Sequence, residues 1–156
     1  MPHLSIVIPA YNEEKRIGRT LEGTFEYLDA QSYDCEVLVV NDGSADRTTE
    51  KVLEFAKRTN GRLRLIENPG NRGKGYAVRN GMLQATGDII LFYDADLATP
   101  TSEIIKVTEP ITEDRYDIVF GSRALNYDLI GVHQSFLREL RGRGGNLFLR
   151  SLLGLD

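Results

Sequence analysis

Two carboxylates, Asp94 and Asp96, stand one residue apart at the end of an apolar run in the stretch "DIILFYDADLATP". Side chains two positions apart in an extended segment project to the same side, so both carboxylates can face one cation. Mg²⁺ or Mn²⁺ is usually held by one or two carboxylates, with phosphate and water oxygens completing the shell. The pair therefore indicates a divalent-metal site, although the same pattern also occurs in capping boxes and surface turns.

A third carboxylate, Asp42, follows a second apolar run in "VVNDGSADRT". An acid at the end of a buried strand can accept hydrogen bonds from a base N–H or a ribose hydroxyl. Asp-Gly is also ordinary turn chemistry, in which the side chain bonds its own backbone. From the residues alone both interpretations of Asp42 stay open.

A glycine-rich stretch, "NPGNRGKGYAVRNG", carries Lys74 and precedes a predicted helix. Glycines allow backbone N–H groups to approach an anion, and the start of a helix favours negative charge. The stretch lacks the Gly-Lys-Ser/Thr of a P-loop, and Val78 occupies the third glycine position of a dinucleotide fingerprint. It indicates an anion-binding loop of another kind, with a flexible turn as the alternative.

The elements that position these groups follow from the apolar periodicity. The sequence predicts strands over residues 4–9, 35–40, 62–67, 88–93 and 116–121. It predicts helices over residues 13–30, from an N-cap at Asp46 to about Thr59, around Ala77 to Ala85, and over 101–113 with an interruption at Pro110. Val52, Leu53, Phe55 and Ala56 are expected on the core side of the second helix.

Alternation of strands and helices predicts an α/β fold, with a mainly parallel sheet covered by helices on both faces, in one domain over residues 1–156. Ligands of such sheets collect beyond the carboxyl ends of the strands. Polar clusters follow the first four strands in turn: "PAYNEE", "NDGS", "ENPGNRGKG" and "DADLATP". The sequence therefore predicts a composite active rim at that edge.

Composition excludes several other classes. The net charge of −4 gives no global electrostatic case for nucleic-acid binding. A single cysteine, Cys35, excludes an internal disulfide and a multi-cysteine metal site. His3 and His133 have no partner at the spacing of metal ligands or of a catalytic pair. The sequence shows no basic leader and no apolar stretch of membrane-spanning length, so we expect a cytoplasmic protein.

The tail from about Gln134 is predicted to be a helix that is both basic and apolar. Arginine suits bidentate phosphate contact, and a basic amphipathic helix also suits a membrane surface. A helix packed on the core is the third interpretation. The arginines concerned are Arg138, Arg141, Arg143 and Arg150.

Five stretches together resemble the family-2 glycosyltransferases of the GT-A fold: "SIVIPAYNEEKRI", "VLVVNDGSADRT", "NRGKGYAVRNGM", "GDIILFYDADLATP" and "DIVFGSRAL". They come in the family's order and at about its spacing, across residues 4 to about 155. Within the family, the chain is most similar to the polyprenyl-phosphate branch, the dolichyl-phosphate glucosyl- and mannosyltransferases. The resemblance implies inverting transfer of a hexose from UDP-glucose or GDP-mannose to a polyprenyl phosphate, with Mg²⁺ or Mn²⁺ as cofactor.

The resemblance also implies roles for particular residues. Asp94 and Asp96 would hold the metal on the nucleotide diphosphate, Asp42 would bind the base, and Lys74 would lie near the diphosphate. The nucleotide pocket would be lined by Pro9, Ala10, Tyr11, Glu13 or Glu14, and Ala95. The acceptor phosphate would face Arg123, Arg138, Arg143 and Asn146. The tail would give peripheral contact with the cytoplasmic face of a membrane.

Relatives in this family continue past "LLGL" into an Asp-x-Gln-like segment, and many add transmembrane helices. The sequence given ends at Asp156, which does not match that acid, so the resemblance implies a catalytic domain truncated at its C-terminus. One alternative is therefore a nucleotide-sugar-binding fragment without turnover, and another is transfer to a glycan hydroxyl. A third is a phosphatase of the haloacid dehalogenase type with Asp94 as nucleophile, although that family places its pair on the first strand.

Overall fold

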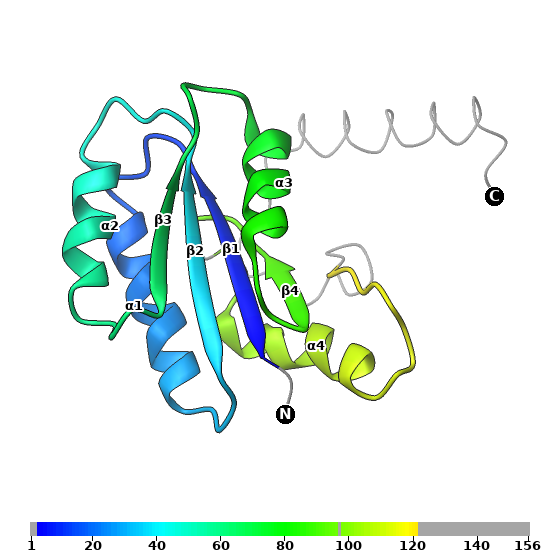
Figure 1. Cartoon of the computed structure of the whole chain (residues 1–156). Helices are drawn as coiled ribbons and strands as arrows, with labels where there is room; N and C mark the ends of the chain where they lie inside the picture. The colour runs from blue at the N-terminus through cyan, green and yellow to red at the C-terminus, as the bar shows by residue number, and fades with distance from the viewer. Residues whose placement is uncertain (1–2, 97, 122–156) are drawn as a thin grey trace, which may run out of the picture. The chain divides into compact units, whose positions relative to one another are not determined.

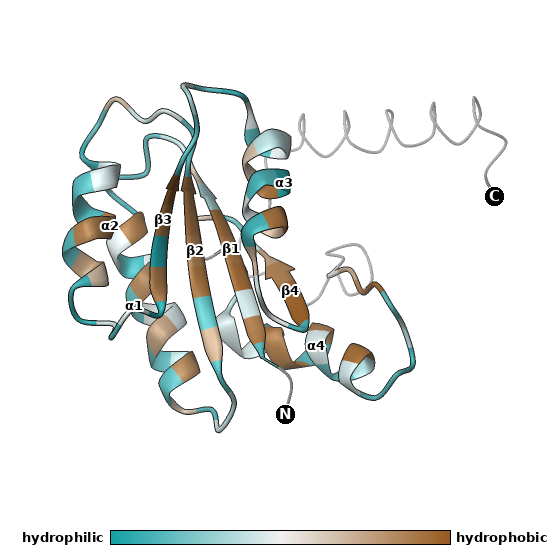
Figure 2. Cartoon of the chain, viewed as in Figure 1, coloured by the Kyte–Doolittle hydropathy of each residue, from teal (hydrophilic) through white to brown (hydrophobic). Residues whose placement is uncertain are grey.

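Four parallel strands form the central sheet of the computed structural model, which describes residues 3–96 and 98–121 (Figure 1). They are β1 (Leu4–Ala10), β2 (Cys35–Asn41), β3 (Leu63–Glu67) and β4 (Ile89–Phe92), in the order β3-β2-β1-β4. The central pair, β1 and β2, is apolar along most of its length, as Figure 2 shows in brown. Continuous apolar runs are typical of parallel strands covered on both faces.

Helices cover both faces of this sheet. They are α1 (Ile17–Asp29), α2 (Thr48–Ala56), α3 (Lys74–Gln84) and α4 (Ile104–Thr112), the last preceded by the 3₁₀ helix η1 (Thr101–Glu103). Alternate strand residues such as Ile6 and Val39 pack in one core cluster with α1, α2 and Ile104 of α4. The residues between them, such as Val7 and Val40, pack with α3. The predicted α/β fold with helices on both faces is confirmed for the residues up to Phe120, which form one compact unit.

Helix α3 contacts the sheet through a glycine, Gly81, that leaves no room for a side chain. A Cβ placed on Gly81 would collide with the methyl groups of Val7 and Val40. The close approach places the first residue of α3, Lys74, in one pocket with residues that follow β1 and β4.

The strand predicted over residues 116–121 is wrong. This segment is irregular, and its side chains Ile118 and Phe120 are 69% and 80% exposed. An alternating apolar segment becomes a strand only where a neighbouring edge accepts its backbone hydrogen bonds. In the described residues, the Tyr116 N–H instead donates to the Pro110 carbonyl at the end of α4.

Three smaller expectations about the helices also need correction. The N-cap of α2 is Arg47 rather than Asp46, and α4 continues through Pro110 to Thr112 instead of being interrupted there. Leu53 is half exposed, because the buried stripe of α2 runs through Val52 and Phe55. Leu53 lies about 100° around the helix from Val52. The helix predicted from Gln134 falls outside the described residues, and within them no helix has the length and apolarity needed to cross a bilayer.

Candidate active site

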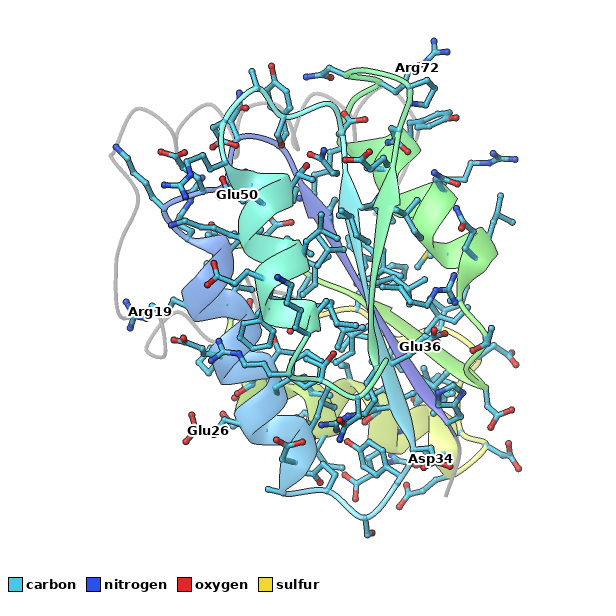
Figure 3. The ribbon with its side chains drawn as sticks, turned by 60° about the vertical axis from the view of Figure 1, so that its left-hand side comes forward. Arg19, Glu26, Asp34, Glu36, Glu50 and Arg72 are labelled. Atoms are coloured by element: carbon cyan, nitrogen blue, oxygen red, sulfur yellow. The ribbon has the colours of Figure 1, made fainter. Side chains whose placement is uncertain are left out.

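A pocket of about 300 Å³ opens at the carboxyl ends of β1, β2 and β4. The strand order runs outward from β1 in both directions, to β2 and β3 on one side and to β4 on the other. Such a reversal leaves a crevice between the loops that follow the two strands, and this is where open α/β sheets bind ligands. Figure 3 shows Arg72, in the glycine-rich loop, at the opposite end of the sheet from Asp34.

Most of the described residues predicted for the nucleotide and metal line this one pocket. Its wall includes Pro9, Ala10, Tyr11, Glu13, Asp42, Lys74, Asp94, Ala95 and Asp96. Four residues of the wall were not predicted: Arg16, Asn71, Gly73 and Ala77. The proposed acceptor residues Arg123, Arg138, Arg143 and Asn146 lie outside the described residues.

Glu14 does not line the pocket, and its contacts explain why. Its N–H donates to Asp46 Oδ2 at 3.0 Å, and its own Oε2 accepts from the Arg47 N–H at 3.1 Å. Glu14 therefore joins the loop after β1 to the start of α2. Of the two acids considered for the nucleotide pocket, the structure brings Glu13 to it.

The loops after β1 and β2 are tied into one frame around the pocket. The Asn12 N–H donates to Ser44 Oγ at 3.0 Å, and Asn12 Oδ1 accepts from the Ala45 N–H at 2.9 Å. The Glu13 N–H donates to Thr48 Oγ1 at 2.8 Å. These hydrogen bonds join segments more than 30 positions apart in the chain, so the rim does not depend on each loop's own conformation.

Asp42 is buried, and its carboxylate is engaged by the glycine-rich loop. It accepts hydrogen bonds from Asn68 Nδ2 at 2.7 Å, from the Gly73 N–H at 2.7 Å and from the Arg72 N–H at 3.0 Å. Burial alone would raise the pKa of Asp42, but these hydrogen bonds outweigh it and hold the pKa below its usual value. Asp42 thus shapes the loop, and contact with a base remains a prediction.

Gly43 allows this loop to lie directly on the turn after β2. Its φ is +74°, and a Cβ there would lie 2.7 Å from both the Asn71 nitrogen and the Gly70 carbonyl carbon. Any side chain at this position would push the two loops apart. The "NDGS" and "PGNRG" motifs therefore act as one structural unit.

Among the acids of the pocket, Asp94 and Asp96 are the least saturated, that is, their carboxylate oxygens accept the fewest hydrogen bonds from the protein. The side chain of Asp94 is 53% exposed and pairs with Lys74 Nζ at 2.5 Å. Asp96 Oδ1 accepts the Ala98 N–H at 2.9 Å, and residues 95–96 form a turn rather than the extended segment expected. Both carboxylates nevertheless line the same pocket.

Glu13 enters the pocket already paired. Arg16 donates to both of its oxygens, from Nε at 2.6 Å and from Nη2 at 2.8 Å. This fork holds Arg16 in the wall of the pocket, where its remaining N–H groups are available to an anionic ligand. The three-residue spacing in "EEKR", at the start of a helix that follows a strand, was a signal that could have identified it.

The charges of the wall fit a divalent cation accompanied by an anion. Four carboxylates, those of Glu13, Asp42, Asp94 and Asp96, share the pocket with two cations, Arg16 and Lys74. No group of three or more metal-ligating side chains occurs among the described residues. Asp94 and Asp96 therefore suit a site in which two carboxylates share a hard cation with phosphate and water oxygens, as Mg²⁺ and Mn²⁺ prefer.

The fold and the pocket define an α/β protein with an acidic pocket at the carboxyl ends of its strands. The chain belongs to glycosyl transferase family 2, whose family model matches residues 5–143. The resemblance drawn from the five motifs is thereby confirmed, and with it the GT-A-type fold class and the polyprenyl-phosphate branch as the set of relatives.

Curated relatives carry names from that branch. The chain is 40% identical over 156 residues to the dolichyl-phosphate beta-glucosyltransferase ALG5D of Trichomonas vaginalis, covering 94% of this chain and 47% of that protein. It is 32% identical over 152 residues to the undecaprenyl-phosphate 4-deoxy-4-formamido-L-arabinose transferase of Pectobacterium carotovorum, covering 97% and 44%. The chain thus spans less than half the length of these relatives.

Solved structures include two similar proteins with bound nucleotides. A mannosyltransferase from Pyrobaculum calidifontis, in complex with GDP-Man and Mn²⁺, is 33% identical with a TM-score of 0.55, over 61% of this chain and 28% of that one. Glucosyl-3-phosphoglycerate synthase from Mycobacterium tuberculosis, in complex with Mn²⁺, UDP and phosphoglyceric acid, is 26% identical with a TM-score of 0.55, over 70% and 39%.

Proposed function

We propose that the pocket binds a nucleotide sugar together with a divalent cation, and that the protein transfers the hexose to a polyprenyl phosphate. We take UDP-glucose as the donor and dolichyl phosphate as the acceptor, because dolichyl-phosphate beta-glucosyltransferases are prominent among the relatives. One observation carries the proposal: residues from four separate strand-end clusters meet in one pocket around Asp94 and Asp96.

The reaction is a single displacement at the anomeric carbon with inversion. An oxygen of the acceptor phosphate forms the new bond to that carbon, while the bond to the diphosphate breaks and the nucleoside diphosphate leaves with the electron pair. A phosphate monoester has a second pKa of about 6, so the nucleophile is already largely anionic near neutral pH. The acceptor therefore needs less help from a general base than a sugar hydroxyl would.

The protein's contribution is to position the donor and to neutralise charge. Asp94 and Asp96 would hold the cation, which when bound stabilises negative charge on the leaving diphosphate. Lys74 and Arg16 stand in the same wall and can contact phosphate oxygens. Asp42 accepts a hydrogen bond from the Gly73 N–H and so holds the loop that leads into α3. It thereby helps to position Lys74, the first residue of α3.

Calorimetric titration with UDP-glucose and with GDP-mannose, with and without Mn²⁺, tests the donor site. We expect UDP-glucose to bind more tightly when Mn²⁺ is present. Asp96→Asn keeps an oxygen for the Ala98 N–H while removing the charge, so it should weaken Mn²⁺-dependent binding at least tenfold, in line with the loss of a charged ligand contact worth more than about 1.4 kcal/mol.

Asp88→Asn is the matched control, because Asp88 precedes the opposite end of β4 and its carboxylate accepts the exposed His3 N–H. It should bind like the wild type. Equal Mn²⁺-dependent affinity for wild type and Asp96→Asn would overturn the metal assignment, and tighter binding of GDP-mannose would overturn the choice of donor.

Transfer is tested separately from binding. Labelled UDP-glucose, Mn²⁺ and a short-chain dolichyl phosphate in detergent should give a labelled lipid that is extracted into organic solvent. Binding without a labelled lipid would reduce the proposal to a nucleotide-sugar-binding protein. A labelled product from a glycan acceptor, and none from the lipid phosphate, would replace the proposed acceptor.

A further inference from the structure

Two threonines stand where helix α1 faces the core. Thr20 and Thr24 are one turn apart on the buried stripe that also holds Leu21 and Phe25, and they are 1% and 0% exposed. Threonine is a weaker helix former than leucine, and a buried hydroxyl is unfavourable unless it is hydrogen-bonded. Apolar residues would suit this stripe better, so the hydroxyls call for a specific partner.

Thr20 finds that partner in the turn between the two aspartates. Its Oγ1 donates to the carbonyl oxygen of Ala95 at 2.6 Å across 75 positions of sequence, and Ala95 is itself only 4% exposed. The same Oγ1 lies 3.1 Å from the Arg16 carbonyl within α1. A hydroxyl has one proton to donate, and the shorter of the two contacts, to the Ala95 carbonyl, is the stronger hydrogen bond.

Thr24 anchors the residue just before the turn. Its hydroxyl is hydrogen-bonded to the Tyr93 hydroxyl, and the Tyr93 N–H donates to the Val7 carbonyl in β1. The segment Asp94–Asp96, called the acidic turn below, is therefore held at two points. Tyr93, just before it, is bonded to β1 and α1, and Ala95 within it is bonded to α1.

The contacts of the aspartates themselves are weaker than this anchor. Asp94 has a half-exposed ion pair with Lys74, and Asp96 has a local bond to the Ala98 N–H. Neither would hold the carboxylates in place when a ligand arrives, whereas the hydrogen-bonded carbonyl belongs to Ala95, the buried residue between them in the chain. A metal site needs its ligands within about 0.5 Å of the productive geometry, and residues behind the ligands provide that precision.

We infer that Thr20 is a positioning residue for the metal site: its hydroxyl fixes the peptide of Ala95 and thereby sets the separation and direction of the Asp94 and Asp96 carboxylates. This inference rests on the proposed function, in which those two carboxylates share a cation. It adds α1 to the elements that determine metal affinity, although α1 contributes no ligand.

Thr108 in α4 shows what a purely local role would look like. It is also buried, at 7% exposed, but its hydroxyl donates to the Ile104 carbonyl of its own helix at 3.0 Å. Thr108→Val is therefore a matched control, because it removes a buried hydroxyl of the same kind without touching the acidic turn.

Mn²⁺ affinity in the presence of UDP, measured by electron paramagnetic resonance of free Mn²⁺, tests the inference. Thr20→Val should weaken Mn²⁺ binding by about tenfold, the lower end of the effect of losing a group that supports a metal ligand. Thr20→Ser keeps a hydroxyl, so its Mn²⁺ affinity should stay within about threefold of wild type. The Mn²⁺ affinity of Thr108→Val should stay within about twofold, well below the tenfold loss expected when a group that supports a metal ligand is removed. Equal affinities for Thr20→Val and Thr108→Val would overturn the inference.

Hydrogen exchange at the amides of residues 94–98 gives a readout that needs no metal. Thr20→Val should speed exchange there at least fivefold relative to Thr108→Val, because the Ala95 carbonyl loses its donor and the turn opens more often. Unchanged exchange would overturn the inference even if the metal is confirmed. Absence of Mn²⁺ binding by the wild type would overturn the proposed function and with it the metal role of Thr20, while faster exchange in Thr20→Val would still show that its hydroxyl holds the turn at Ala95.

Discussion

Two carboxylates at opposite ends of the sheet, those of Glu36 and Asp94, differ in how far the protein fills their hydrogen-bonding capacity. At the amino ends, the Glu36 side chain is 10% exposed and accepts hydrogen bonds from Ser5 Oγ, the Thr86 N–H and Thr86 Oγ1, each at 2.7 Å, with Arg64 at 3.1 Å. At the carboxyl ends, Asp94 is 53% exposed and has Lys74 as its partner. An acid whose lone pairs are filled by the protein holds the fold together, and an acid left unsaturated retains capacity for a ligand.

Asp42 shows that saturation, and not the end of the sheet, makes this distinction. It lies in the same pocket as Asp94, yet it is 3% exposed and bonded to Asn68, Arg72 and Gly73. In the saturation of its carboxylate, Asp42 therefore resembles Glu36 more than it resembles Asp94. Substitution of a saturated acid should therefore lower the free energy of unfolding more than substitution of an unsaturated acid or of its partner.

Glu36→Ala should have the largest effect on stability. It leaves the Ser5 hydroxyl and both Thr86 donors without their acceptor, and the free energy of unfolding should fall by about 3 kcal/mol. Urea denaturation followed by circular dichroism measures the change. Affinity for UDP-glucose in the remaining folded protein should equal that of wild type, and a matching loss of affinity would break the comparison between the two ends.

Asp42→Ala should come second, lowering the free energy of unfolding by about 2 kcal/mol because the Gly73 and Arg72 N–H groups lose their acceptor. Unlike Glu36→Ala, it should also weaken UDP-glucose binding, since the loop that begins α3 is released. The two readouts come from denaturation and from calorimetry. Lost affinity with unchanged stability would show that Asp42 acts on the ligand alone.

Acid should weaken the fold through the same two saturated carboxylates. Burial would raise the pKa of Glu36, but hydrogen bonds from Ser5 and Thr86 hold it below its usual value, and Asp42 likewise has a lowered pKa. Groups with a lowered folded pKa stabilise the protein above the unfolded pKa, and this stabilisation is lost as pH falls through the folded pKa. Urea midpoints should therefore decline as the pH falls below the ordinary pKa of a glutamate, about 4.3. Glu36→Gln should decline less steeply, and a parallel decline would contradict this assignment.

Asp96→Asn should change the free energy of unfolding by less than about 0.5 kcal/mol, since its amide oxygen can still accept the Ala98 N–H. Thermal unfolding without metal measures this. The same variant carries the large expected loss of Mn²⁺-dependent binding, so one protein separates stability from ligand capacity. A stability loss close to that of Asp42→Ala would place Asp96 among the saturated acids.

Lys74→Met should also have little effect on the fold, because a half-exposed ion pair contributes about 0–1 kcal/mol. Removing the ammonium frees Asp94 Oδ1, so Mn²⁺ affinity without nucleotide should rise by up to about fivefold, the equivalent of that energy. Lys74→Arg, which keeps the charge, is the control and should not show the rise. Weaker Mn²⁺ binding by Lys74→Met would show that Lys74 does not compete for Asp94.

Predictions from the sequence succeeded where a local pattern is enforced by burial. Ile17, Leu21, Phe25 and Leu28 recur at helical spacing within the helix predicted over residues 13–30, and all four are buried in α1. Residues 116–121 carry an equally apolar pattern but form no strand in the described chain. Strand formation requires a partner edge, and a pattern within one segment contains no information about that edge.

Within the site, residue type indicated chemistry but not saturation. Asp42 and Asp94 both follow apolar runs, and nothing local distinguishes the first, bonded by a loop about 30 residues away, from the second. Thr20 passed as an ordinary helix residue because its partner, Ala95, lies 75 positions along the chain. Arg16 differs, because its three-residue spacing from Glu13 is visible in the sequence itself.

The sequence by itself determined the alternation of elements, the family and the strand-end positions of the acids, because each is written in short-range order along the chain. Only the tertiary structure decided which acids are saturated, since hydrogen bonds between distant loops fill the carboxylates of Asp42 and Glu36. It also decided what lies behind the two aspartates of "DADLATP". A buried threonine on α1 donates to the carbonyl of Ala95, the residue between them, and that contact exists only once helix and sheet have packed.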